Sequence, residues 1–243
     1  MLIMKNIVLV AVLFLAGLSS FAQGDKVIND KNAEKRTVAA FHAIRISSGI
    51  DLYLNQSGDE AVAISASGAE DRSRIRTEVE AGVLKIYMEN NGFHWGFGSN
   101  RHLKAYVSCK VLDGLKASGG SDVFLEGMLR VDKLDLELSG GSDLRGKLNA
   151  QDLSIVQSGG ADCYLSGTAS RLSVHASGGS DLHGNDLAAD NCRIEASGGS
   201  DVHIVVNKEL SVSATGGSDV YYSGSGVIRE SHSSGSGSIH RRG

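Results

Sequence analysis

Apolar and polar residues alternate strictly along the second half of the chain. Leu134, Leu136 and Leu138 are separated by Asp135 and Glu137, so every second residue is apolar. The same alternation begins again at Leu153, Leu172, Cys192 and Leu210. A period of two is typical of a β-strand that buries one face. The pattern therefore predicts a series of strands that share one apolar core.

A Gly-rich motif follows each of these strands. Its first copy in the chain is Ser118-Gly-Gly-Ser-Asp122. The later copies end at Asp143, Asp162, Asp181, Asp201 and Asp219, at steps of 21, 19, 19, 20 and 18 residues. Glycine adopts positive φ at no steric cost, and Ser and Asp side chains bond nearby backbone N–H groups. The motif therefore predicts a sharp corner between two strands.

Repeats of about 19 residues predict an all-β protein, a right-handed parallel β-helix or solenoid. One coil alone buries too little apolar surface to offset a backbone entropy loss of about 1–2 kcal/mol per residue. Stacked coils pair every strand above and below and close a continuous core. The right-handed crossover is the usual one between parallel strands. A left-handed hexapeptide solenoid is disfavoured because no six-residue apolar repeat is present.

We expect a single β-helix domain over residues 38–243. Residues 38–117 alternate without the Gly-rich motif and predict irregular coils. Strands are expected there over 41–46, 50–54, 62–65, 83–88 and 103–111, with one helical turn over 69–74. Regular coils follow over 118–222, and the Ser/Gly-rich residues 223–243 are expected to cap or fray the last coil.

The N-terminus has the features of an export signal. Lys5 precedes an uncharged apolar stretch over 7–18, shorter than the roughly 20 residues of a membrane span. Small residues before Gln23 predict cleavage at that point. Residues 1–22 are interpreted as a signal peptide, with an uncleaved anchor as the alternative, and 23–37 as a flexible polar tether. The mature chain, which has no second apolar run of this length, is expected in the periplasm, on the cell surface or outside the cell.

Composition supports the strand prediction and excludes one class of function. With 31 glycines and no proline, the chain lacks the composition of collagen and keeps every backbone N–H available for pairing. The formal net charge of −4 argues against a nucleic-acid partner, which requires a basic excess. Cys109, Cys163 and Cys192 occupy apolar positions and are expected as buried thiols, with a bridge between Cys163 and Cys192 as the alternative.

Several motifs resemble one bacterial family. Residues 48–54 read Ser-Gly-Ile-Asp-Leu-Tyr-Leu, and Leu112, Leu115 and Ala117 precede the first Gly-rich turn. With the Gly-Ser-Asp coils, these features resemble the putative auto-transporter adhesin, head GIN domain family over about 38–242, although Asp51 stands where that family has Asn. The resemblance implies a right-handed parallel β-helix similar to pectin-lyase-like folds, an adhesin-like role and no enzymatic activity. It implies no functional residue that can be carried over.

The repeated aspartates are the first candidate site. Asp122, Asp143, Asp162, Asp181, Asp201 and Asp219 are expected along one edge of the solenoid, about 4.8 Å apart, as paired strands are. Stacked carboxylates repel one another, so each needs a compensating partner. Turn N–H groups can supply it, in which case the protein needs no cofactor. Calcium is the alternative, because it binds carboxylate oxygens.

The second candidate is the outward position two residues after each aspartate. It is occupied by Phe124, Arg145, Tyr164, His183, His203 and Tyr221. Rings beside acids suit a glycan. The alternative is a structural ladder, in which like rings on neighbouring strands stabilise the sheet. His183 and His203 could also bind a metal, but they lack the third ligand that a zinc site needs.

Residues 90–100 break the strand pattern and predict a loop. Phe93, Trp95 and Phe97 are interleaved with His94 and glycine, and Trp95 is the only tryptophan of the chain. Exposed aromatic residues on a loop often mark a contact with a partner or a glycan. The alternative is a lid that folds over the N-terminal end of the solenoid.

The sequence as a whole predicts an exported, non-catalytic module that presents a repeated polar face to a glycan or a cell-surface protein. No coil departs from its neighbours as a catalytic site requires, so no catalytic residue is assigned. Two alternatives stay open. One is a polysaccharide-acting enzyme of the pectin-lyase-like type, active or degenerate, and the other is a purely structural envelope protein.

Overall fold

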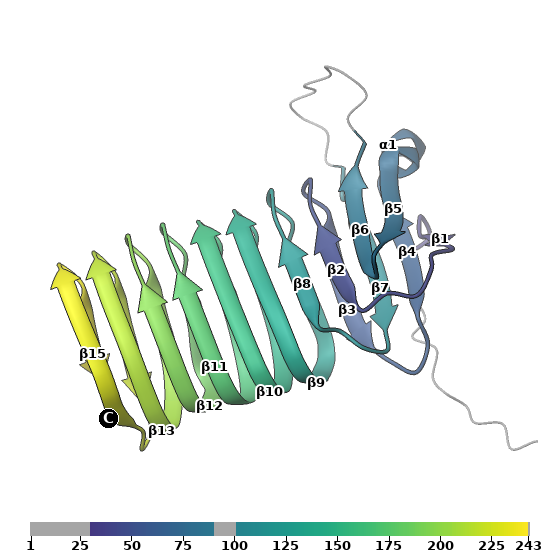
Figure 1. Ribbon diagram of the computed structural model, residues 1–243. Helices are drawn as coiled ribbons and strands as arrows, with labels where there is room; N and C mark the ends of the chain where they lie inside the picture. The colour runs from purple at the N-terminus through teal and green to yellow at the C-terminus, as the bar shows by residue number, and fades with distance from the viewer. Residues whose placement is uncertain (1–29, 90–100, 243) are drawn as a thin grey trace, which may run out of the picture.

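The computed structural model describes residues 30–89 and 101–242. It is a stack of parallel coils, which lie side by side along the length of the molecule (Figure 1). In the regular part, each coil is one long, bent strand. These strands are β9 (Val123–Gly140), β10 (Leu144–Gly159), β11 (Cys163–Ala176), β12 (Leu182–Ala196) and β13 (Asp201–Gly216). The all-β parallel solenoid predicted from the repeat is confirmed.

Each coil contributes to two faces of the solenoid. After the aspartate, the chain runs along one face, which we call the ladder face. It then bends and returns along the other, the return face, which points toward the viewer in Figure 1. Pairing stays in register on both, since Leu144 lies beside Cys163 and Ile155 beside Val174. The inward residues of both faces are buried, so the core is the space between them.

The final coil is made of shorter pieces, β14 (Asp219–Ser223), β15 (Val227–Gly235) and β16 (Ser238–Arg241). β15 continues the return face beside β13, and β16 continues the ladder face beside β14. Residues 223–243, expected as a cap, thus supply the last strands of the stack. Ser231 and Ser233 occupy the inward positions beside Val212 and Ala214. At the end of the return face, the inward side chains therefore carry hydroxyl groups where the preceding coil has apolar side chains.

The N-terminal region contains seven further strands and one helix. They are β2 (Ala43–Ile46), β3 (Asp51–Gln56), β4 (Ala61–Ser65), α1 (Ala69–Arg74), β5 (Ile75–Glu80), β6 (Val83–Met88), β7 (Lys104–Cys109) and β8 (Gly114–Ala117). The expected helical turn and five strands are present, with every end within two residues of its predicted position. The strand β5 was not predicted, and it forms an antiparallel hairpin with β6.

The coils of this region do not follow one another in chain order. β2 pairs with both β6 and β8, and β3 pairs with both β7 and β9. The coil of β2 and β3 is the first in the sequence, but in space it lies between the coil of β6 and β7 and the coil of β8 and β9 (Figure 1). β4 runs antiparallel to β7, so this region also contains strands outside the parallel coils.

Part of the predicted tether belongs to the fold. Glu34–Arg36 forms strand β1, which pairs antiparallel with β4 at the edge of the ladder face. Arg72 of α1 also bonds Glu34, with 3.1 Å between Nε and Oε2. Residues 34–36 are therefore ordered, because hydrogen bonds and an ion pair offset the low apolar content that predicted a flexible segment.

All three cysteines are buried free thiols. Burial raises the pKa of Cys109 to about 11 and that of Cys192 to about 12. Cys163 lies beside Leu182 on the ladder face, whereas Cys192 lies beside Leu172 on the return face. The bridge considered between Cys163 and Cys192 is absent, because the two thiols belong to different faces.

Candidate functional site

The Gly-rich turns form a column of aspartates, and most of these carboxylates accept a hydrogen bond from the following coil. The backbone N–H of Asp143 donates to Oδ1 of Asp122 at 3.2 Å, and that of Asp201 to Oδ1 of Asp181 at 3.0 Å. The amides of Asp162 and Asp181 bond Asp143 and Asp162 in the same way. Turn N–H groups thus compensate these carboxylates, as the first of the two sequence interpretations supposed.

The column is longer than the repeat suggested. Asp51 of β3 extends it beyond Asp122, and Lys104 lies beside Asp51 at its N-terminal end. Burial raises the pKa of Asp51, and the neighbouring charge of Asp122 raises it further. At the other end, the Ser238 hydroxyl bonds Oδ1 of Asp219.

Within residues 30–89 and 101–242, no group of three or more His, Cys, Asp or Glu side chains is placed to hold a metal ion. This covers the six repeat aspartates and the pair His183 and His203. Calcium binding by the aspartate column stays a prediction that a melting experiment with calcium and EDTA would test.

A buried serine precedes most of the aspartates, and the hydroxyls of Ser180, Ser200 and Ser218 bond backbone carbonyl oxygens inside the turns. Ser200 Oγ donates to the carbonyl oxygens of Ala176 and Ser197, at 3.2 and 3.0 Å. Ala161 replaces this serine in one coil. There the buried Gln157 takes over, because its Nε2 donates to the carbonyl oxygens of Ala161 and Asp181 at 2.9 and 3.0 Å.

Beside the aspartates runs a continuous row of side chains, which we call the side-chain ladder. In spatial order its members are Tyr106, Tyr53, Phe124, Arg145, Tyr164, His183, His203, Tyr221 and His240. Ring centroids are 4.4 Å apart between Tyr164 and His183, and 4.7 Å apart between His203 and Tyr221. The ring planes of these two pairs differ by 13° and 8°, so the rings stack face to face.

Two arginines and one aspartate make further contacts with the rings of the ladder. The Arg145 guanidinium lies 4.7 Å from the Tyr164 ring centroid, and that of Arg242 lies 4.4 Å from the Tyr221 centroid. Tyr106 donates its hydroxyl hydrogen to Asp30 at 2.9 Å. The ladder therefore combines ring stacking with cation–π contacts along the whole described face.

The sequence located six of the nine ladder positions. Tyr53 stands two residues after Asp51, so the same rule could have found it. His240 stands two residues after Ser238, where the aspartate is replaced. Tyr106 carries no such signal, because Lys104 occupies the aspartate position in its strand.

Stacking determines what the ladder can offer to a ligand. Each inner ring is covered on both faces by its neighbours, while its outer edge meets solvent, as the partial exposure of Tyr164, His183, His203 and Tyr221 shows. The accessible groups are therefore phenol hydroxyls, imidazole nitrogens and the adjacent carboxylates. Such edges form hydrogen bonds rather than stacking contacts.

His203 is the most enclosed imidazole of the ladder. Its Nδ1 is buried and has no hydrogen-bond partner. Burial lowers the pKa of His203, and the charges of Arg242 and His183 lower it further. The neutral imidazole is thus the form that fits the stack.

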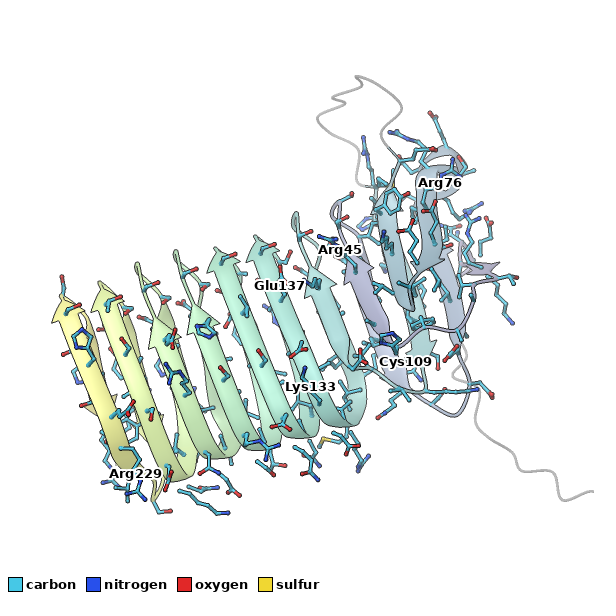
Figure 2. All side chains as sticks on the ribbon, viewed as in Figure 1. Arg45, Arg76, Cys109, Lys133, Glu137 and Arg229 are labelled. Atoms are coloured by element: carbon cyan, nitrogen blue, oxygen red, sulfur yellow. The ribbon has the colours of Figure 1, made fainter. Side chains whose placement is uncertain are left out.

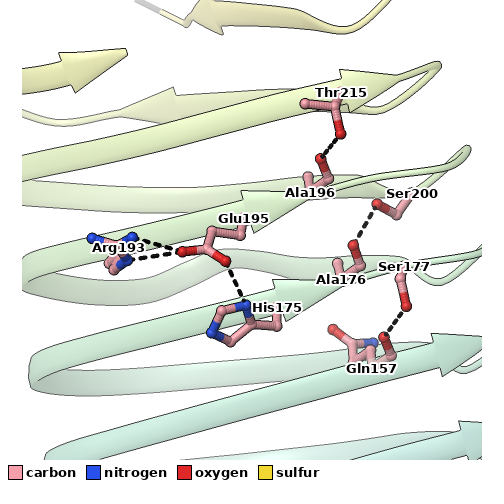
Figure 3. Close-up of polar contacts among 9 residues, drawn as sticks. All are labelled: Gln157, His175, Ala176, Ser177, Arg193, Glu195, Ala196, Ser200 and Thr215. Carbon is pink, nitrogen blue, oxygen red and sulfur yellow. Dashed lines mark hydrogen bonds and ion pairs between the residues drawn. The ribbon is translucent and has the colours of Figure 1, made fainter. Parts of the chain in front are cut away.

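The return face carries a different arrangement, which sequence patterns did not single out. Glu195 accepts hydrogen bonds from Arg193 and forms an ion pair with His175, 3.0 Å from Nδ1 to Oε2 (Figure 3). The Arg193 contact lowers the pKa of Glu195, and His175 adds to that effect. Other charged side chains, such as Lys133 and Glu137, project from this face along β9 (Figure 2).

A hollow crosses the return face where small side chains lie between these charged ones. Ser211 lies between Arg193 and Glu230, and the neighbouring Ser213 lies between Glu195 and His232. Arg193 and His175 already pair with Glu195, so the polar lining of the hollow contains charges of both signs. Asp51, whose pKa is raised, lines neither this hollow nor the one at the lower bend beside Arg130.

Phe93, Trp95 and Phe97 lie outside the residues that the structure describes. Their predicted role in contacting a partner, or in covering the N-terminal end, stays a prediction.

Comparison with protein families identifies the chain's relatives. The model of the family described as putative auto-transporter adhesin, head GIN domain, matches residues 40–226. The chain belongs to this family. The match covers the first coil, the antiparallel hairpin and all of the regular coils, so the head GIN domain accounts for nearly the whole described fold.

Several solved structures have a similar fold. A putative adhesin from Bacteroides fragilis is 22% identical, with a TM-score of 0.78 over 86% of this chain and 96% of that one. A putative lipid binding protein from Parabacteroides distasonis is 20% identical, with a TM-score of 0.64 over 88% and 98% of the two chains. A putative adhesin from Parabacteroides merdae is 17% identical, with a TM-score of 0.64 over 87% and 95%. At these identities the similarity shows the fold alone.

A search of curated proteins gives no match for this head GIN domain. The names of the family and of two of these three structures are those of adhesins, in keeping with a module that binds some partner. The described part of the chain contains no helix with the length and apolar character needed to span a membrane.

Proposed function

We propose that this head GIN domain is an exported, non-catalytic binding module that presents its ladder face to a glycan on or near the cell surface. The observation that carries the proposal is the row of ring and guanidinium edges beside the aspartate column. A row of this kind gives a ligand a polar side-chain edge at nearly every coil, about 4.8 Å apart. That repetition suits an extended polymer that lies along the solenoid axis.

The chemistry of the exposed groups favours a polyhydroxylated ligand. Tyr164 and Tyr221 offer hydroxyls, His183 offers an imidazole nitrogen, and the partly buried carboxylates beside them accept hydrogen bonds. Sugar hydroxyls both donate and accept, so they can match this mixed edge. Stacking of a sugar on an inner ring is disfavoured, because neighbouring side chains already cover the ring faces.

The repetition also argues against catalysis. A catalytic centre requires one place unlike its neighbours, with groups of shifted pKa gathered in a cleft. Here Asp51 and Glu195, two carboxyls with shifted pKa, lie on different faces. The adhesin names of the family and of related structures agree with a binding role.

Glycan-array binding of the purified protein is the first test, and phenylalanine variants locate the site. Tyr164→Phe and Tyr221→Phe keep the stacked rings but remove the hydroxyl edges. We expect retention on one class of glycan and at least about a fivefold loss of affinity in the double variant, since each lost hydrogen bond is worth about 1 kcal/mol. Tyr87→Phe, on the return face, is the matched control and should bind normally.

Two results would change the proposal. Retention on no glycan would redirect the search to protein partners or to a structural role in the envelope. Glycan binding that the double variant leaves intact would move the site away from the ladder. Trp95→Ala then tests the loop: lost binding at unchanged stability supports a contact there, whereas lost stability at unchanged binding supports a lid.

Export is tested separately from binding. The apolar leader before Gln23 supports secretion through a cleaved signal peptide. N-terminal sequencing of the protein recovered from the cell envelope should begin at Gln23. An intact leader in the purified protein would instead indicate an anchored form.

A further inference from the structure

A hollow at the lower bend follows from the unusual spatial order of the N-terminal coils. The lower bend is where a coil passes from the ladder face to the return face, at the bottom of Figure 1. Residues 110–113 make this bend between β7 and β8, and residues 130–133 lie in the corresponding bend of β9. On the return face β8 and β9 are neighbours, but on the ladder face β3 lies between β7 and β9. The two bends therefore diverge, and a hollow of about 650 Å³ opens beside them.

Gln56, the last residue of β3, bridges the two diverging bends. Its Nε2 donates to the carbonyl oxygens of Lys110 and Arg130, at 3.2 and 2.9 Å. The backbone N–H of Arg130 donates in turn to Oε1 of Gln56 at 2.9 Å. One side chain thus fixes the separation of the bends and holds the backbone of both cationic residues.

Lys110 and Arg130 bring unpaired positive charge to this hollow. Both side chains are exposed and line it. Neither side chain forms an ion pair or a hydrogen bond within the part of the chain that the structure describes. Two cations held beside each other without a counter-ion are a ready partner for an anionic group.

Most of the other charged groups that line the hollow already have partners. Lys133, which Figure 2 labels, forms an ion pair with Asp135 at 2.9 Å. Asp113 forms a hydrogen bond with Nδ1 of His42 at 2.8 Å. Asp132 is an exposed acid for which the described residues provide no such partner. Two unpaired cations against one unpaired acid leave an excess of positive charge.

The rest of the lining suits a sugar ring. Val111, which is 60% exposed, and the partly buried Val131 offer apolar surface. The bends of the later coils contribute amide and hydroxyl groups, from Asn149, Gln151 and Ser170. The Thr168 hydroxyl donates to Oδ1 of Asn149 at 3.1 Å, which leaves the Nδ2 hydrogens of that amide for a ligand. An apolar surface with a few polar groups around it is the usual lining of a small-molecule site.

We propose that this hollow is a second binding site, which takes a sugar acid, either free or as one residue of an acidic polysaccharide. The carboxylate faces Arg130, whose planar guanidinium donates two parallel hydrogen bonds, and Lys110 donates a third. The ring lies against Val111, with its hydroxyls toward Asn149. The site lies at the lower bend and uses no residue of the side-chain ladder, so it does not depend on the function proposed above.

Titration with glucuronate, followed by amide NMR of the purified protein, tests the proposal. We expect shifts of the backbone amides of Val111 and Arg130 and of the side-chain amide of Gln56. Glucose lacks the carboxylate and acetate lacks the ring, so each should bind about tenfold more weakly than glucuronate. An oligoglucuronate distinguishes the two sources of the ligand: tighter binding than the monomer assigns the site to a polysaccharide, and equal binding assigns it to a free sugar acid.

Charge-removing variants locate the carboxylate. Arg130→Gln and Lys110→Gln leave the backbone bonds to Gln56 in place, and each should weaken glucuronate binding about fivefold. Lys208→Gln removes an equal charge at the lower bend of β13, outside the hollow, and should bind normally.

The ladder variant is the second control. The double variant Tyr164→Phe, Tyr221→Phe should bind glucuronate as the native protein does, since it alters the ladder face alone. Equal binding of acetate and glucuronate would reduce the hollow to a general anion contact, and equal binding of glucose and glucuronate would remove the role of the carboxylate. Either result would overturn the proposal, as would an absence of shifts at the hollow or normal binding by Arg130→Gln and Lys110→Gln. Thermal melts of every variant separate these outcomes from loss of the fold.

Discussion

The N-terminal region and the regular coils bury the same kinds of residues by different means. In the regular coils, each strand pairs with the next one in the chain, and the same turn closes every coil. In the N-terminal region, the coil of β2 and β3 is bonded on both sides by strands that come later in the chain. Repetition thus gives a stack that can be extended, whereas long-range pairing gives a finished end.

The difference is visible in one turn. Ser48 occupies the position of Gly119 in the neighbouring coil, as the pairing of Leu52 with Val123 shows. Both residues have positive φ, 72° for Ser48 and 65° for Gly119. The regular coils use glycine at this corner throughout, while the N-terminal coil tolerates a strained serine there.

The largest of these effects is expected at a Gly-rich turn, where neighbouring regular coils approach each other closely. Gly178 has a φ of +77°, and a Cβ there would lie 2.8 Å from the carbonyl oxygen of Gly159. Gly178→Ala should therefore lower the free energy of unfolding by at least about 2 kcal/mol, measured by urea denaturation. Gly179→Ala is the matched control, because its Cβ would lie 3.8 Å from the same oxygen at an ordinary φ. Equal losses in the two variants would show that the close approach is unimportant.

The next effect concerns the one coil that lacks the turn serine. Gln157→Leu removes the two hydrogen bonds to carbonyl oxygens and should cost about 1–2 kcal/mol. Adding Ala161→Ser supplies the hydroxyl that Ser180 provides in the next coil, where it donates to the carbonyl oxygen of Ser177 at 3.0 Å, and should recover most of the loss. Urea unfolding of the two single variants and the double variant measures this coupling. If the changes in unfolding free energy of the two single variants simply add in the double variant, glutamine and serine do not substitute for each other.

A smaller gain is expected in the N-terminal turn. Ser48→Gly relieves the positive φ but makes the unfolded chain more flexible, so a net stabilisation of about 0.5 kcal/mol is expected. A rise in melting temperature, measured by circular dichroism, would show that glycine is favoured at this corner, as it is in the regular coils. A fall would mean that the serine side chain contributes more than its backbone strain costs.

The smallest effect is the pH dependence of the side-chain ladder. The pKa of His203 is lowered in the folded protein, so its contribution to stability is complete above the ordinary value near 6.5 and is lost as the pH falls below it. His203→Phe keeps a stacked ring without a titratable group. Urea titrations between pH 7 and pH 5 should show less loss of stability in this variant than in the native protein. Identical slopes would assign the pH dependence to other groups.

The regular coils could be predicted from the sequence because each physical requirement recurs at the same spacing. Alternation set the strands, the glycine pair set the corners, and the aspartate gave the position from which outward residues could be counted. Six ladder members, including Tyr164 and His183, followed from that count. The role of Gln157 could not be seen, because it depends on the absence of a hydroxyl at Ala161 in the folded turn.

The N-terminal region resisted prediction because its spatial order differs from its chain order. Tyr106 stacks on Tyr53, and Tyr53 on Phe124, although 53 residues of chain separate the first pair and 71 the second. Local patterns contain no information about which distant strand is the neighbour. Tyr106, which begins the ladder, could therefore be read as a strand residue but not placed in the row.

The clamped first coil also determines how the protein would respond to mechanical load. A pull on the C-terminal coil detaches strands bonded on one edge only, so coils would peel away one after another. A pull on the first coil must break the bonds on both of its edges at once. For a protein held at one end while its partner is dragged by flow, this makes the N-terminal end the natural anchor, with the C-terminal coils yielding first and absorbing the extension.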